Sequence, residues 1–211
     1  MFRRARTDRL ILRCYKTECC SSVLKTIEQI IKAINFIDLI VIIDGEQNCA
    51  DSLFLAVIGQ QNRGNARIKI ECNSSVPLEM LLQLPKMHCL KLSGCAINDV
   101  ILHHITANVN IAFVEDEGQY SPQGILDAFE MVCRSKSSTK AMWFSSRKSA
   151  CSEIEPLVKL NVQLELDPRD HSTIVHSDCK SMMLFLPFTT FTDREEDDDR
   201  IVICMGRMTS R

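Results

Sequence analysis

The sequence ARIKIEC, residues 66–72, alternates polar and apolar side chains as a β-strand with one buried face does. It is followed by PLEMLLQL, residues 77–84, whose leading proline and spaced leucines predict a short helix. The sequence HCLKLSG, residues 88–94, then alternates again. Together the three stretches predict a strand, a crossover helix and a second strand parallel to the first.

The same unit recurs along most of the chain. Predicted strands begin near residues 9, 38, 66, 88, 109, 139 and 161, and helical patterns fall between several of them, as at 21–36, 52–60, 97–107 and 121–134. This spacing is typical of leucine-rich repeats of about 20–29 residues, which bury their apolar faces by stacking. Strict alternation also indicates strands covered on one face only. We therefore predict an α/β fold, with a leucine-rich-repeat-like open parallel sheet in a solenoid-like domain at residues 1–170.

The end of the chain has a different pattern. Strand-like runs at 173–175, 181–188 and 200–204 follow one another without helices, and the acidic run DREEDDDR at 193–200 joins the last two. Terminal units of repeat proteins are usually atypical. The sequence therefore predicts a small antiparallel β appendage, a C-terminal β-hairpin cap at residues 171–211.

Composition narrows the function classes. The formal net charge of -2 gives no basic excess for nucleic acid, so we expect no nucleic-acid partner. The longest apolar run, residues 36–43, is far shorter than the roughly 20 residues of a membrane span, so we expect no membrane contact. Eleven cysteines without a signal-peptide pattern indicate reduced thiols in a cytoplasmic or nuclear protein. We expect the chain to be monomeric by itself.

Motifs for catalysis and cofactor binding are missing from the sequence. The seven glycines form neither a phosphate-binding loop nor a dinucleotide fingerprint, and there is no GxSxG nucleophile motif. We therefore predict no enzyme activity and no cofactor. His171, His176 and Cys179 have residue types that zinc prefers, but they lack a nearby fourth ligand and any CxxC pair. We interpret them as a polar loop without metal.

A family resemblance adds a more specific expectation. The stretches 67–70, 76–84 and 88–99 resemble nematode F-box-associated domains, and the helix at 124–133, the strand at 141–144 and the final strand at 201–205 are similar in outline. The resemblance implies a protein–protein interaction module that recognises substrates for an SCF-type ubiquitin ligase. In that family an N-terminal F-box binds the adaptor. Since the first predicted strand begins near residue 9, we expect this sequence to lack its own F-box.

The uncovered strand face is the expected site for a partner protein. Alternation places six polar residues on it: Arg13, Lys69, Glu71, Lys91, Gln163 and Glu165. The alternatives are a scaffolding or degenerate paralogue, or a small α/β enzyme with a site at the carboxyl ends of the strands. For the enzyme, the candidates are Asp44, Glu115 and Asp116. Strand order separates the two folds, because sequential neighbours favour the solenoid and a central switch point favours the enzyme.

Overall fold

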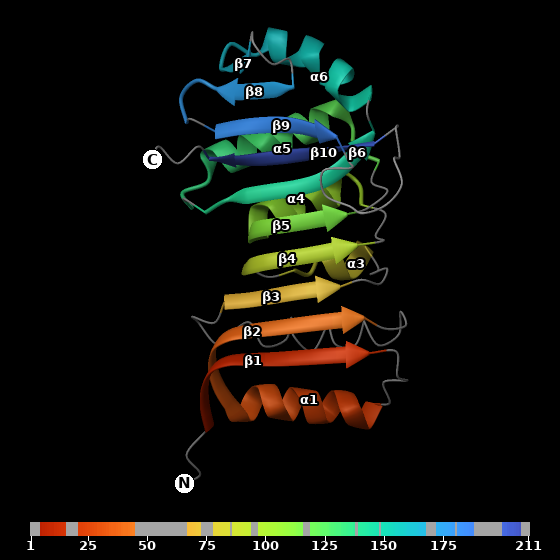
Figure 1. The fold of residues 1–211 in the computed structure, drawn as a ribbon, viewed down its shortest axis with the longest axis vertical. Coiled ribbons are helices and arrows are strands. Elements are labelled where there is room, and N and C mark those ends of the chain that lie inside the picture. Colours follow the sequence, from red (N-terminus) through yellow and green to blue (C-terminus); the bar gives the residue numbers. More distant parts are fainter. Residues whose placement is uncertain are drawn as a thin grey trace.

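The computed structural model describes residues 5–15, 21–44, 67–72, 78–84, 86–93, 97–115, 119–137, 139–147, 149–167, 172–179, 181–187 and 200–207. Within these ranges ten strands form one mixed sheet, which Figure 1 shows as a tall, twisted stack. The sheet confirms an α/β fold that is mostly parallel, with antiparallel strands at its C-terminal end.

The first six strands lie side by side in chain order. They are β1 (Ala5–Tyr15), β2 (Ile34–Asp44), β3 (Arg67–Cys72), β4 (Met87–Ser93), β5 (Val109–Glu115) and β6 (Ala141–Arg147). Each pairs with the next in parallel. Strand order is sequential among these six strands and breaks only between β6 and its next neighbour, the last described strand of the chain.

The last four strands extend the same sheet in reverse order. Next to β6 lies β10 (Arg200–Arg207), followed by β9 (Ser181–Pro187), β8 (Thr173–His176) and β7 (Leu164–Leu166), all antiparallel to their neighbours. The spacing of the strands predicted that residues 161–166 would continue the parallel series after β6, and this prediction is wrong. Instead β7 forms the far edge and pairs with β8 across the expected domain division at residue 170.

Five helices are described: α1 (Ser21–Ala33), α3 (Leu78–Leu81), α4 (Asp99–Asn108), α5 (Pro122–Arg134) and α6 (Ser149–Leu160). Two of them begin with side-chain caps. The Asn98 side chain accepts a hydrogen bond from the backbone N–H of Ile101, and the Ser121 hydroxyl accepts one from Gly124. The expected helix at 52–60 lies outside the described residues, whereas α6 was not anticipated.

The hydrophobic core lies between the helices and one face of the sheet, and α4 and α5 lie behind the strands in Figure 1. A single rung of paired residues crosses the sheet on this face, and each member is buried or packed against the core. We call it the covered rung; it consists of Leu12, Val41, Ile70, Leu90, Ala112, Met142, Met205, Met183, Ile174 and Leu166. Among the described helices, none is long and apolar enough to cross a membrane.

Candidate binding face

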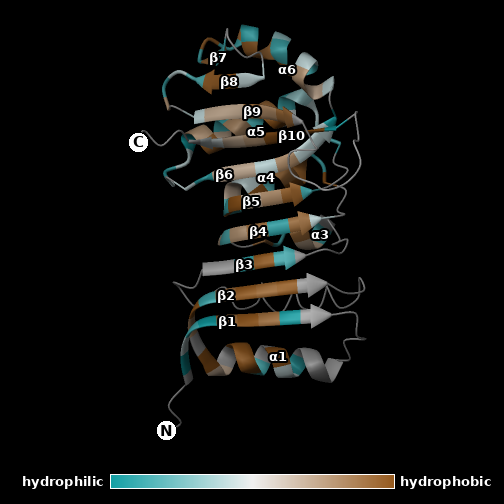
Figure 2. Ribbon diagram, viewed as in Figure 1, coloured by the Kyte–Doolittle hydropathy of each residue, from teal (hydrophilic) through white to brown (hydrophobic). Residues whose placement is uncertain are grey.

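The other side of the same strands forms a second surface, which we call the open face. Its central rung lies one residue away from the covered rung on nine of the ten strands. Along the sheet it changes from mainly charged residues to mainly apolar ones. This open rung consists of Arg13, Ile42, Glu71, Lys91, Phe113, Trp143, Cys204, Leu184 and Thr173. In Figure 2, β2 is hydrophobic over most of its length, whereas β3 and β4 carry hydrophilic segments.

Three of the predicted residues meet on the open face of β3 and β4. The Glu71 carboxylate lies 3.3 Å from the Lys69 ammonium and 3.4 Å from the Lys91 ammonium. Partial burial raises the pKa of Glu71. The positive charges of Lys69 and Lys91 and their hydrogen bonds together lower it by more, so the pKa of Glu71 lies below its usual value. We call these three residues the charged cluster.

The other three predicted residues lie apart from the charged cluster. Arg13 is exposed on β1 and is separated from Glu71 by Ile42 of β2. Gln163 and Glu165 are exposed at the opposite end of the sheet, six strand spacings from Lys91, or about 29 Å. Gln163 lies just before β7, and its amide donates a hydrogen bond to the Asp178 carboxylate at 3.0 Å. The six residues therefore do not form one continuous stripe.

Apolar residues that the sequence analysis did not single out fill the gap between these groups. Phe113 of β5 is 40% exposed and stacks on Trp143 of β6, with ring centroids 4.6 Å apart and planes 9° from parallel. Next to Trp143, Val202 and Cys204 of β10 are buried, and Leu184 and Leu186 of β9 pack against them. These residues form a second hydrophobic cluster, separate from the main core.

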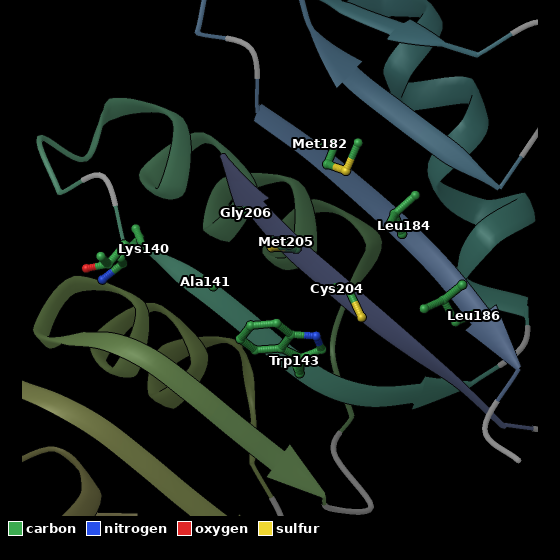
Figure 3. Close-up of a pocket in the computed structure, with 10 residues that line it drawn as sticks. Lys140, Ala141, Trp143, Met182, Leu184, Leu186, Cys204, Met205 and Gly206 are labelled. Carbon is green, nitrogen blue, oxygen red and sulfur yellow. The ribbon is translucent and has the colours of Figure 1, made fainter. Parts of the chain in front are cut away.

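The second cluster borders a shallow groove of about 380 Å³. Figure 3 shows Trp143 on one side of Cys204, with Leu184 and Leu186 on the other. Gly206 lines the groove, and an added Cβ there would make ordinary contacts, 3.7 Å from the Lys140 carbonyl oxygen and 3.8 Å from the Ala141 Cβ. We call it the apolar groove; it is lined by Thr139, Lys140, Ala141, Trp143, Met182, Leu184, Leu186, Cys204, Met205 and Gly206.

Two titratable groups at the groove have shifted pKa values: burial raises the pKa of Cys204 to about 11, and the other group is Lys140. Lys140 is only 4% exposed, and its ammonium donates a hydrogen bond to the backbone carbonyl of Val109. Burial disfavours the charged form and lowers the pKa of Lys140 to about 8. The carbonyl contact directs this amine to the start of β5.

The candidates for catalysis do not converge. Asp44 ends β2 and Glu115 ends β5, three strand spacings or about 14 Å apart, and Asp116 lies outside the described residues. Of the zinc-type residues, His171 also lies outside them. His176 and Cys179, however, lie together with a third residue, Cys133.

Comparisons of the chain with protein-family models, characterised proteins and solved structures find no match. The functional interpretation therefore depends on the residues of the chain and their arrangement.

Proposed function

We propose that the chain is a protein–protein interaction module that binds its partner on the open face. The partner presents an apolar side chain that enters the apolar groove, and the Phe113–Trp143 pair contacts the flanking residues of the partner. The charged cluster lies at the edge of this contact and favours a partner with polar groups at the matching position.

The observation that carries the proposal is the position of the stacked aromatic pair, of which Phe113 is exposed and Trp143 is partly buried. Phe113 and Trp143 stack on each other on the face opposite the main core, directly beside the groove. Tryptophan is among the residues enriched in binding hot spots, and interface cores are depleted in charge. Lys69 and Lys91 are about 40% exposed, which is typical of an interface rim.

A finer form of the proposal includes the repeat architecture and the ubiquitin ligase. The sequential parallel order of β1–β6 supports repeats similar to leucine-rich ones, in which an exposed sheet surface is available for binding. The resemblance to F-box-associated domains would make the partner a ligase substrate. In that role a separate F-box would connect the chain to the ligase adaptor.

The test measures partner capture by variants that alter the groove but not the core. Trp143→Ala removes the aromatic wall, and Gly206→Leu adds a bulky side chain to the lining, at a site where the Cβ itself has ordinary contact distances. We expect both variants to lose more than about ten-fold in captured partner, as hot-spot residues do. Leu160→Ala is the matched control, because Leu160 is an apolar side chain on α6 that is 82% exposed.

The captures use tagged full-length chain and cytosolic extract, with the melting temperature of each variant as the check on folding. Equal recovery of the same partner by the wild type, Trp143→Ala and Gly206→Leu would reject the open face as the binding site. For the finer form, a grafted N-terminal F-box should add the ligase adaptor to the captured proteins without displacing the partner. A grafted chain that captures adaptor but no other protein would reject the substrate-recognition role.

A further inference from the structure

Two thiols and an imidazole converge at the C-terminal end of α5. Cys133 belongs to the last turn of that helix, His176 ends β8, and Cys179 lies in the turn before β9. Their candidate ligand atoms, two Sγ atoms and one ring nitrogen, all lie within 4.8 Å of one another. The three residues are separated by up to 46 positions in the sequence (179 minus 133), so the fold alone brings them together.

We propose that Cys133, His176 and Cys179 bind one zinc ion, with water as the fourth ligand. Thiolate and imidazole are the protein ligands that zinc prefers, and a set of two cysteines and one histidine is an established three-ligand combination. A tetrahedral ion with Zn–S distances of about 2.3 Å places two sulfur ligands roughly 3.8 Å apart. The cluster therefore needs to contract by about 1 Å at most to enclose the ion.

The surroundings suit a metal that remains partly accessible. Cys133 is 5% exposed and His176 is 8% exposed, whereas Cys179 is half-buried and leaves a route for water. The Ser181 hydroxyl, which is fully buried, accepts a hydrogen bond from the Cys179 thiol at 3.1 Å, and metal binding would reverse the direction of this bond. In the zinc-bound chain this hydroxyl would donate to the thiolate, as second-shell groups do for ligating cysteines.

Two further interactions would have to change when the metal binds. In the metal-free chain burial, and then the hydrogen bond with Cys179, raise the pKa of Cys133 to about 12, so the ion must displace a thiol proton. The backbone N–H of Asp178 donates to Nδ1 of His176 at 3.2 Å. A neutral imidazole that binds the metal through one nitrogen carries its proton on the other, so this hydrogen bond breaks whichever nitrogen binds. Loss of this bond gives a specific signature at the Asp178 amide.

The experiment is a titration of the full-length chain with cobalt(II) and then zinc(II) under reducing conditions. Cobalt(II) takes the place of zinc and shows thiolate-to-metal charge transfer and the visible bands of a tetrahedral ion. We expect these bands to saturate, to disappear when zinc displaces cobalt, and to accompany a shift of the Asp178 amide resonance. Reducing conditions also keep Cys133 and Cys179 from joining in a disulfide, which would occupy both sulfurs.

Variants decide whether the bands arise from this cluster, since the chain has eleven cysteines. Cys179→Ser and Cys133→Ser should each weaken the metal affinity by more than about ten-fold, because even second-shell changes cost 10–100-fold. Cys179 is half-buried, so its variant keeps the test decisive if Cys133→Ser does not fold. Cys89→Ser, a buried cysteine of β4, is the matched control and should bind as the wild type does.

Two results would overturn the proposal. One is a wild-type chain without charge-transfer bands or an Asp178 shift at saturating metal. The other is equal affinity in Cys179→Ser and Cys89→Ser, which would assign the bands to other cysteines.

Discussion

The two faces of the sheet use the same ten strands for different purposes. On the covered side, one rung contains ten apolar residues from Leu12 to Leu166, and none of its central members is more than 2% exposed. One residue away on nine of these strands, the open rung passes from Arg13 through an ion-paired cluster to a stacked aromatic pair. In each of these strands, therefore, one residue packs into the core and an adjacent one lies on the open face.

This separation shows where the open face is unusual. Its first strands have the mixed polar surface expected beside solvent, whereas β5, β6, β10 and β9 carry apolar residues without a described helix above them. Exposed apolar patches on soluble domains often mark interaction sites. Because of this contrast, we place the proposed contact on β5, β6, β10 and β9.

The largest expected difference compares two phenylalanines on neighbouring strands. Phe144 of β6 is 1% exposed in the core, and Phe113 of β5 is 40% exposed on the open face. We expect Phe144→Ala to lower the free energy of unfolding by about 3–5 kcal/mol, because it leaves a cavity. Phe113→Ala should cost only about 1 kcal/mol, the value of an aromatic contact. Urea denaturation measures both, and similar losses would mean that the open face is as tightly packed as the core.

A second test concerns the buried charge of Lys140, where β6 begins. Its pKa is about 8 in the folded chain against an ordinary value of 10.5, so between these values the unfolded chain binds more protons. Stability should therefore rise with pH across that window, by up to about 3 kcal/mol relative to Lys140→Met, which lacks the titrating amine. Denaturation at pH 8 and at pH 10.5 checks the difference. A parallel pH dependence in wild type and Lys140→Met would show that the amine is solvated.

The smallest expected effect is at the charged cluster. Glu71→Gln removes both ion pairs and leaves two lysines facing each other, yet these groups are partly exposed, so the loss should stay below about 1 kcal/mol. Since the pKa of Glu71 is lowered on folding, its contribution is present above 4.5 and is lost as pH falls through the lowered value. The difference from wild type should shrink in high salt. A large loss of stability that does not depend on salt would instead mean that Glu71 stabilises the fold as a buried core residue does.

Periodicity predicted most of the strands, because each alternates residues between two faces with different solvent contact. The stretches 67–72 and 87–93 match the predicted strands to within about a residue at each end. By contrast, α6 contains Pro156, a residue that argues against a helix interior, and it was not predicted. Packing of Ile154 and Val158 into the core compensates for this local preference.

Local sequence patterns could not predict the strand order at the C-terminal end of the sheet. A short run such as Leu164–Leu166 reads as a strand in either direction, and only long-range pairing decides its neighbour. The same limit applies to the candidate sites. The positions of Lys69, Glu71 and Lys91 on one face could be predicted from alternation alone, whereas the Phe113–Trp143 pair needed the register of β5 and β6. Cys133 joins His176 and Cys179 only through the packing of α5 on the last strands.

The position of β10 has a consequence for synthesis of the chain. It pairs with β6 on one side and β9 on the other, so residues 200–207 connect the two halves of the sheet. During translation β6 has no partner on this side until those residues leave the ribosome, and an unpaired strand edge promotes aggregation. A nascent chain arrested before residue 200 should therefore require chaperone protection.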